Sequence, residues 1–257
     1  MLNNKKATNW SRDELIVAFN LYCKTPFTKI NSRNKAVIEL APIVGRSPSS
    51  VALKLANFAR LDPALQERNI SGMRHGSKVE AEIWNEFSHN WEELAYQSEL
   101  ILARFKNDSI ENSTGIIKEG LPPEGRERDV IVKARVNQSF FRQTILASYD
   151  NKCCITGISV PELLVAGHII PWSIDKKNRM NPRNGLCLNA LHDMAFDKGF
   201  ITITIDYRVK ISKVLKQQSG PELLFIPYDN KKIALPQRFT PSKEFIEYHN
   251  RHIFRGN

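Results

Sequence analysis

A change of pattern near the middle of the chain most constrains its fold. The segment Lys106–Asp129, KNDSIENSTGIIKEGLPPEGRERD, is rich in Asn, Ser, Gly, Pro and charged residues and has no hydrophobic periodicity. This composition is typical of a linker between domains. Helical patterns dominate before it and strand patterns appear only after it, so we predict an α+β protein. Its parts are a helical domain at 1–106, a linker at 107–130 and a second domain at 131–257.

The first half carries clear helix starts. In NWSRDELIVAFNLYCK, Ser11 is expected to cap a helix and Glu14 to complete a capping box. A second helical pattern, NKAVIELAPIVG, ends at Gly45, and Ser47–Pro48 opens a third, SPSSVALKLANFARL. Two helices joined by a short turn with Gly form the helix-turn-helix arrangement, which predicts a DNA-binding domain as one interpretation.

The exposed face of the third helical pattern is expected to present Lys54 and Arg60, which are suited to contact DNA phosphates. Many helical hairpins bind no nucleic acid, so a purely structural role of these helices stays open. The aromatic residues Trp84, Phe87 and Trp91 are expected in the core rather than in a platform for base stacking.

In the second half of the chain, polar residues fall on a predicted strand, a loop, a second strand and a helix, in that order. LLVAGHIIPW predicts a strand that carries His168, and the polar loop after it ends at Asn184. GLCLNALHDMAFDKG predicts a short strand that enters a helix with His192 and ends at Gly199. FITITIDYRVKIS predicts a β-hairpin that turns at Asp206-Tyr207.

His168, Asn184 and His192 in this β-β-α order resemble the HNH (ββα-metal) endonuclease superfamily, and more closely its restriction endonuclease branch. The similarity is carried by FFRQTILASYDNKCCITGI, LLVAGHIIPW, NPRNGLCLNALHDMAFDKGFITI and RVKIS. It therefore covers roughly 135–212, and its several ordered anchors make it specific. The resemblance implies a C-terminal HNH nuclease domain with an extension after it.

Each of the three anchors has an expected role in phosphodiester hydrolysis. A histidine with a pKa of about 6.5 is mostly neutral near pH 7 and can take a proton from water, which suits His168 as the base. The resemblance implies that Asn184 orients the base, with direct metal contact in some relatives. A plain turn before Gly185 is compatible with that role. His192 is implied as a metal ligand.

The second protein ligand of the metal is open. Many members of the superfamily have Asp directly before the strand histidine, whereas this chain has Gly167. Asp193 and Asp197 are the nearest candidates, and we prefer Asp197, although capping or an ion pair with Lys198 explains it equally well. The expected ligand set is therefore His192, Asp197 and Asn184. The expected ion is Mg²⁺ or Mn²⁺, with Zn²⁺ or Ni²⁺ as alternatives.

Charge favours a polyanionic partner. Residues 1–60 carry ten Lys and Arg against three Asp and Glu, and residues 137–257 carry seventeen against ten. Between them, residues 61–100 carry three against eight, so the basic charge is concentrated in two regions. The family motif places Arg135, Gln138 and Arg142 where DNA phosphate contact is expected, although packing explains part of this segment.

Composition excludes other classes of protein. No apolar run approaches the roughly 18 residues needed to cross a bilayer, and the N-terminus lacks the apolar core of a signal peptide, so we expect a cytoplasmic protein. The four cysteines form no CxxC motif, which argues against a disulfide scaffold or a zinc site of four thiolates.

The sequence thus predicts a metal-dependent DNA endonuclease of the restriction or defence type. Two alternatives stay open. One is a DNA-binding regulator whose HNH fold no longer cuts, because Gly167 stands where many members of the superfamily have the Asp ligand. The other is a nicking or toxin-like nuclease with little sequence preference. Since one active site cuts one strand, a homodimer is expected for double-strand cleavage.

Overall fold

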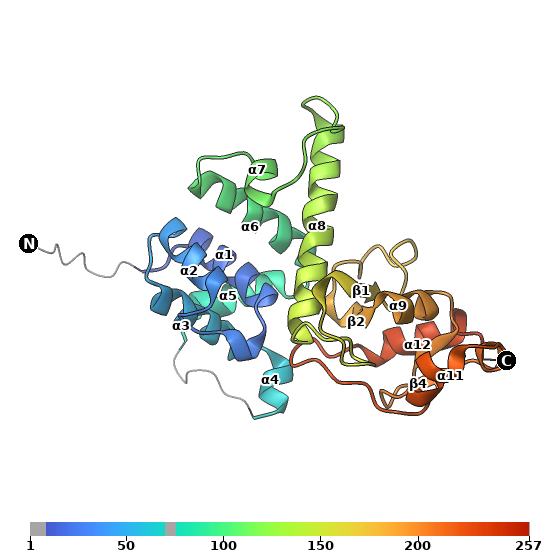
Figure 1. Cartoon of the computed structure of the whole chain (residues 1–257). Helices are drawn as coiled ribbons and strands as arrows, with labels where there is room; N and C mark the ends of the chain where they lie inside the picture. Colours follow the sequence, from blue (N-terminus) through green and yellow to red (C-terminus); the bar gives the residue numbers. More distant parts are fainter. Residues whose placement is uncertain (1–8, 70–75, 257) are drawn as a thin grey trace, which may run out of the picture. The chain divides into compact units, whose positions relative to one another are not determined.

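The computed structural model describes residues 9–69 and 76–256 and divides the chain into two compact units (Figure 1). Unit 1 comprises Met1–Tyr22 and Lys29–Asn137, and unit 2 comprises Cys23–Thr28 and Gln138–Asn257. The mixture of many helices with two small sheets agrees with the α+β class. Within the two described ranges, no helix combines the length and apolarity needed to cross a membrane.

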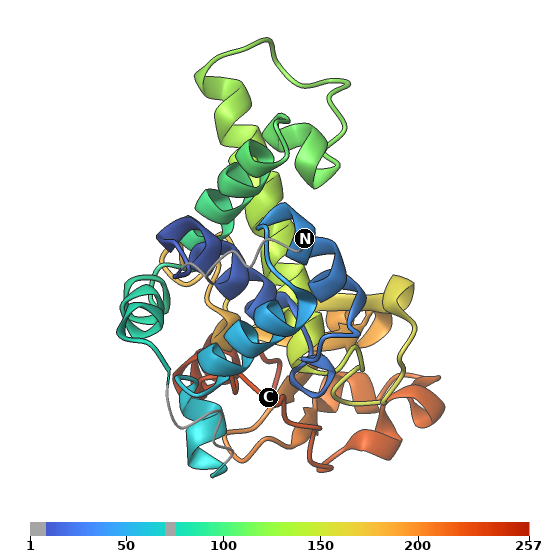
Figure 2. The same cartoon turned by 90° about the vertical axis from the view of Figure 1, so that its left-hand side faces the viewer.

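Unit 1 is built from helices, which Figure 2 shows from a second side. Its elements are most of α1 (Arg12–Lys24), α2 (Lys35–Ile43), α3 (Pro48–Ala59), α4 (Pro63–Glu67), α5 (Lys78–Phe87), α6 (Trp91–Phe105), α7 (Ile110–Thr114) and the first half of α8 (Arg126–Ser148). The last two residues of α1 and most of η1 (Phe27–Lys29) belong to unit 2. The predicted starts are confirmed: Ser11 and Glu14 form a capping box, and the Ser47 side chain accepts from the backbone N–H of Ser50. Helices α2 and α3 pack on each other, and DNA reading by them stays a prediction.

Aromatic side chains form the core of unit 1. The Phe19 ring lies 4.8 Å from that of Phe58 and 5.1 Å from that of Trp84, measured between ring centroids. Phe87 and Trp91 are buried as well, so the expectation that these aromatic residues belong to the core is confirmed.

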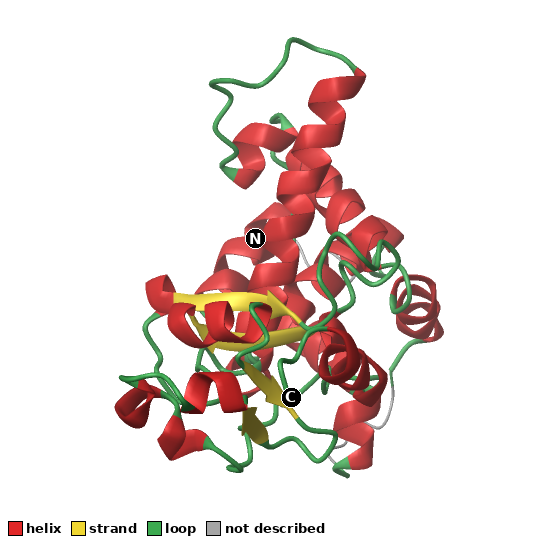
Figure 3. Cartoon of the chain, turned by 90° about the vertical axis from the view of Figure 1, so that its right-hand side faces the viewer, coloured by secondary structure: helices red, strands yellow, loops and turns green. Residues whose placement is uncertain are grey.

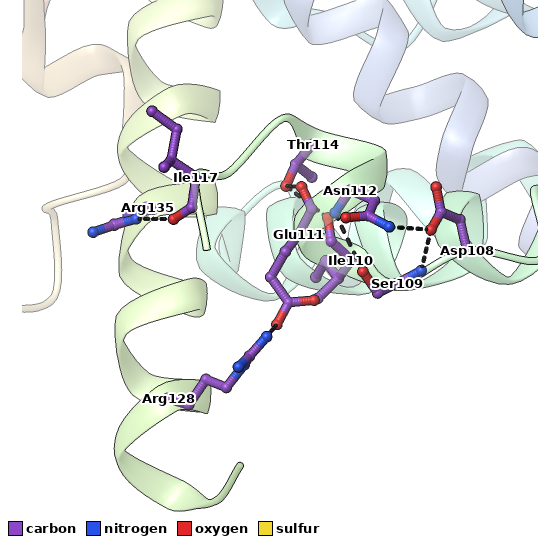
Figure 4. Close-up of polar contacts among 9 residues, drawn as sticks. All are labelled: Asp108, Ser109, Ile110, Glu111, Asn112, Thr114, Ile117, Arg128 and Arg135. Atoms are coloured by element: carbon purple, nitrogen blue, oxygen red, sulfur yellow. Dashed lines mark hydrogen bonds and ion pairs between the residues drawn. The ribbon is translucent and has the colours of Figure 1, made fainter. Parts of the chain in front are cut away.

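The segment 107–130, which the sequence predicts as a linker, is part of unit 1 and forms α7 and the start of α8 (Figure 4). Ser109 caps α7, and the Asp108 carboxylate accepts from Asn112 Nδ2 at 2.7 Å. The Arg128 guanidinium binds the Glu111 carboxylate at 2.7 Å. The polar residues that suggested a linker therefore hold the segment in place, and in sequence the units divide after Asn137, within α8.

Unit 2 contains two antiparallel hairpins and the helices that flank them (Figure 3). Its elements are the second half of α8, η2 (Pro161–Leu163), β1 (Leu164–His168), η3 (Pro182–Asn184), β2 (Gly185–Asn189), α9 (Ala190–Asp197), β3 (Ile201–Ile203), β4 (Val209–Ile211), α10 (Lys213–Lys216), α11 (Pro221–Leu224), η4 (Ile226–Tyr228) and α12 (Lys243–His252). Strand β1 pairs with β2 from Leu164↔Asn189 to His168↔Gly185. The predicted order of strand, loop, strand and helix is therefore confirmed.

Helix α8 packs closely on the end of the first hairpin. A Cβ atom added to Gly185 would overlap the side chain of Ile145 and lie 3.0 Å from Cζ of Phe141. Only glycine fits there without displacing the α8 side chains. Because Gly185 pairs with His168, this contact fixes the end of β1 that carries the histidine.

Helix α12 is attached to the C-terminal end of α9 by the buried side chain of His249. Its Nε2–H donates to the carbonyl of Phe196 at 3.1 Å, and its Nδ1 lies 2.8 Å from the hydroxyl of Thr202. The ring also stacks on Phe196 with centroids 3.8 Å apart. Burial lowers the pKa of His249 to about 4, so the ring is neutral in the folded protein at neutral pH.

We expect His249 to make unit 2 sensitive to acid. The pKa of this group is lower in the folded chain than in the unfolded chain, so its stabilising contribution is complete above about pH 6.5 and is lost as the pH falls towards 4. One pKa unit corresponds to about 1.4 kcal/mol, so the loss approaches about 3 kcal/mol. Urea unfolding at pH 7 and pH 4.5 measures it. His249→Gln should flatten this dependence, whereas His252→Gln on the exposed face of α12 should keep it.

Candidate active site

His168 lies at the C-terminal end of β1 with its ring orientation fixed on three sides. Its Nε2 is 2.9 Å from the carbonyl oxygen of Arg179, which only accepts, so Nε2 carries the proton and the lone pair of the neutral ring is on Nδ1. The ring stacks on Phe141, with centroids 4.1 Å apart and planes 6° apart, and meets the edge of Trp172 at 5.5 Å.

The surroundings of His168 favour its neutral form. Burial lowers the pKa of His168, and the hydrogen bond to the Arg179 carbonyl acts in the opposite direction. A hollow of about 340 Å³ opens beside the ring, lined by Gln138, Phe141, Arg142, Val165, Ala166, His168 and Trp172. A neutral imidazole at the edge of a hollow is suited to take a proton from a water molecule or a substrate there.

Asn184 holds the loop between the two strands. Its Oδ1 accepts from the backbone N–H of Ile170 at 2.8 Å, and its Nδ2 donates to the carbonyls of Ile170 at 3.1 Å and Asn178 at 3.3 Å. The residue is fully buried, and both ends of its amide are bonded to backbone. Asn178 directly precedes Arg179, whose carbonyl binds His168. Asn184 therefore orients the histidine through the loop rather than by touching the ring.

A carboxylate from α9 occupies the space beside Gly167. A Cβ atom added to Gly167 would overlap Oδ1 of Asp193, so the carboxylate lies directly against the strand, one residue before His168. This Oδ1 is buried and has no hydrogen-bond partner among the residues that the structure describes. Burial, reinforced by the neighbouring Asp197, raises the pKa of Asp193 to about 7.

Asp197 lies on the same side of α9 as Asp193, because residues four positions apart share a helix face. Burial raises the pKa of Asp197, while Lys198 acts in the opposite direction. The two carboxylates disfavour each other's ionisation, and a bound cation would relieve this repulsion. Among the described residues, no three His, Cys, Asp or Glu side chains are grouped closely enough to hold a cation by themselves.

The comparison with known families matches residues 153–204 to a family described as HNH endonuclease. The match contains β1, β2 and α9, and with them His168, Asn184 and Asp193. The chain carries an HNH endonuclease domain. A search of curated proteins gave no match to the chain.

The third anchor of the HNH domain, His192, packs against aromatic residues of the C-terminal segment. Its Nδ1 lies 3.1 Å from Oδ1 of Asn189, and its ring packs against Phe225 at 5.0 Å and Tyr228 at 5.6 Å between centroids. Its Nε2 is buried, and no described residue forms a hydrogen bond to it. Burial lowers the pKa of His192 despite the nearby carbonyl of Leu224. The ring lines a largely apolar cavity of about 430 Å³.

The side chains expected to bind DNA differ in whether they are already engaged in hydrogen bonds within the protein. Arg142 donates to the carbonyls of Leu164 at 2.7 Å and Pro161 at 3.0 Å, and Gln138 is exposed beside the same hollow as His168. In unit 1, Arg135 donates to the carbonyl of Ile117 at 3.1 Å (Figure 4). Of these three residues, Gln138 has the side chain most available to a substrate at the HNH domain.

Lys54 and Arg60 are both held inside unit 1. Lys54 forms an ion pair with the fully buried carboxylate of Glu80, which also accepts from Asn57 at 3.0 Å. Arg60 is partly buried, and its Nε is buried without a hydrogen-bond partner among the described residues. A role of either residue in DNA binding would require these side chains to move, and it stays a prediction.

Reasoning from the sequence missed two groups of the site, the Phe141 ring and the Arg179 carbonyl, and it ranked Asp193 below Asp197. A signal for Asp193 was present: an isolated glycine in a strand often marks the close approach of another group, and Gly167 is such a residue. The backbone carbonyl of Arg179 has no signal, because any residue type supplies one.

We expect Asn184→Ala to loosen the loop that orients His168. The substitution leaves the Ile170 N–H without its partner, and an unsatisfied buried group costs about 1 to 3 kcal/mol. Urea unfolding measures the loss. Asn181→Ala is the comparison: the half-buried Asn181 side chain caps the neighbouring η3 turn and donates to Oδ1 of Asn178, and its loss should cost less because water can reach these groups. Equal stability of Asn184→Ala and the unmodified protein would contradict the role of Asn184 in the loop.

Proposed function

We propose that the chain is a metal-dependent DNA endonuclease that hydrolyses phosphodiester bonds. The observation that carries the proposal is the pairing of two groups at one strand end. His168 donates through Nε2 to the Arg179 carbonyl, which leaves the lone pair of the neutral ring on Nδ1. One residue earlier, at Gly167, the strand is met by Oδ1 of Asp193, which is buried and has no hydrogen-bond partner among the described residues. These are a base and an anchor for a cation, which phosphodiester hydrolysis requires.

His168 acts as the general base in this proposal. Its Nε2–H stays on the Arg179 carbonyl, so Nδ1 accepts the proton of the attacking water. Because its pKa is lowered, the ring is already deprotonated at neutral pH and needs no prior loss of a proton. Asn184 acts as a positioning residue, since it holds the carbonyl of Asn178 beside Arg179.

Asp193 and Asp197 fit a hard divalent cation such as Mg²⁺ or Mn²⁺. Both supply carboxylate oxygens, and Mg²⁺ is commonly held by one or two carboxylates together with substrate phosphates and water. A bound cation would offset the charge that develops on the phosphate and on the leaving oxygen. Asp193 replaces His192 and Asn184 in the proposed ligand set, because the His192 ring faces Phe225 and the Asn184 amide is engaged by backbone. A nitrogen ligand from His192, as Zn²⁺ or Ni²⁺ would favour, is the alternative.

DNA is the proposed substrate because residues 137–257 carry seventeen Lys and Arg against ten Asp and Glu. Such an excess attracts polyanions. The restriction or defence role rests on the resemblance of the sequence to that branch. The regulator that no longer cuts is the leading alternative. The buried Oδ1 of Asp193 beside Gly167, which has no hydrogen-bond partner among the described residues, argues against it.

The test incubates the protein with supercoiled plasmid, methylated and unmethylated, in Mg²⁺, Mn²⁺ or chelator. We expect metal-dependent cleavage, with His168→Ala slowing it by at least about 10²-fold because a general base is lost. Asp193→Asn should also abolish cleavage. The matched controls are His252→Ala and Glu244→Gln, which alter exposed side chains of α12 and should cut at the normal rate.

The products separate the remaining alternatives. Linear plasmid formed without accumulation of nicked circles indicates two active sites acting together and supports a homodimer on DNA. Nicked circles alone support a nicking enzyme. Retention of DNA without cleavage under any condition would refute the nuclease and favour the regulator.

A further inference from the structure

We infer that Phe141 is a positioning residue of this active site, which sets the plane of the His168 ring by stacking on its face. The inference rests on the proposed function for its catalytic consequence. It adds a residue of α8 to the site, and Phe141 lies outside the matched segment 153–204.

The contact is nearly ideal for fixing a ring. The two planes differ by 6° and the centroids are 4.1 Å apart, so the face of the imidazole is covered by the face of the phenyl ring. The Arg179 carbonyl fixes one nitrogen but still permits the ring to rock about that hydrogen bond. The stack removes this freedom, because rocking would drive the imidazole into Phe141. Nδ1 is thereby held in one direction.

Phe141 is itself held rigidly. Its Cζ atom packs so near Gly185 that a Cβ there would lie 3.0 Å away, and Gly185 is the β2 partner of His168. The phenyl ring therefore contacts both Gly185 on β2 and the imidazole of His168 on β1. Any residue other than glycine at 185 would press on Phe141 and Ile145 and disturb the stack.

The neighbouring Phe140 allows the positioning role to be separated from simple core packing. Both phenylalanines are buried on α8, but the Phe140 ring lies 5.7 Å from the ammonium group of Lys24, and among the described residues it is Phe141 that stacks on His168. The charged residues around this part of the site lie at other positions: Arg142 lines the same hollow, the Arg179 backbone carbonyl binds the imidazole, and Asp193 packs against Gly167. None of them is altered when either phenylalanine is replaced.

The experiment compares Phe141→Leu with Phe140→Leu in the full chain. Both variants lose an aromatic ring from the core, so similar losses of stability in urea are expected. Only Phe141→Leu should slow single-turnover plasmid cleavage, on the order of tenfold to a hundredfold, because misplacement of a catalytic group has an effect of this size. Its pH–rate profile should also shift towards higher pH, since removing the phenyl ring exposes the imidazole to water and raises its pKa.

A second measurement does not depend on cleavage. In the NMR spectrum of the imidazole protons, the ring current of Phe141 should shift the His168 signals, and Phe141→Leu should remove that shift while Phe140→Leu keeps it. Unchanged His168 signals and titration in Phe141→Leu would overturn the inference, as would an unchanged cleavage rate and pH profile. If the unmodified protein cuts no DNA, the proposed function fails, and the NMR comparison still decides whether Phe141 positions the ring.

Discussion

The site depends on the amide of Asn184, which closes the loop that follows β1. This amide binds the N–H and the carbonyl of Ile170 on one side and the carbonyl of Asn178 on the other. These bonds hold the residue next to Arg179, whose carbonyl lies on the imidazole of His168, and the bond from Arg179 Nε to the carbonyl of Trp172 holds the same loop. A buried amide that satisfies three backbone groups is a stiff connection, because breaking any bond leaves a polar group unpaired in the interior.

Two helices then meet the C-terminal end of β1 and contact different residues there. On the α8 side, Phe141 stacks on His168 and packs against Gly185, which fixes the base. On the α9 side, Gly167 leaves room for the carboxylate of Asp193. Gly167 and His168 are the last two residues of β1, so both helices reach the same end of the strand. In the proposed site, α9 supplies an acidic group beside the position that Gly167 holds.

The sequence predicted the hairpin and the helix after it, because periodicity and spacing are local signals. It failed at 107–130, where side chains of Glu111 and Arg128 convert an apparent linker into part of a compact unit. Amino-acid composition does not show which distant residues, such as Glu111 and Arg128, form an ion pair. The sequence also ranked Asp197 above Asp193, since only the three-dimensional fold shows which carboxylate meets Gly167. Likewise, no pattern revealed that the His192 ring faces Phe225.

The central claim is that Asp193 anchors a cation beside His168. The most direct test adds Mn²⁺ to the protein and follows the line widths of the His168 imidazole protons by NMR, because a bound paramagnetic ion broadens nearby signals. We predict broadening in the unmodified protein and in His192→Gln, and sharp lines in Asp193→Asn. Broadening that persists in Asp193→Asn and disappears in His192→Gln would contradict the claim and place the cation on His192.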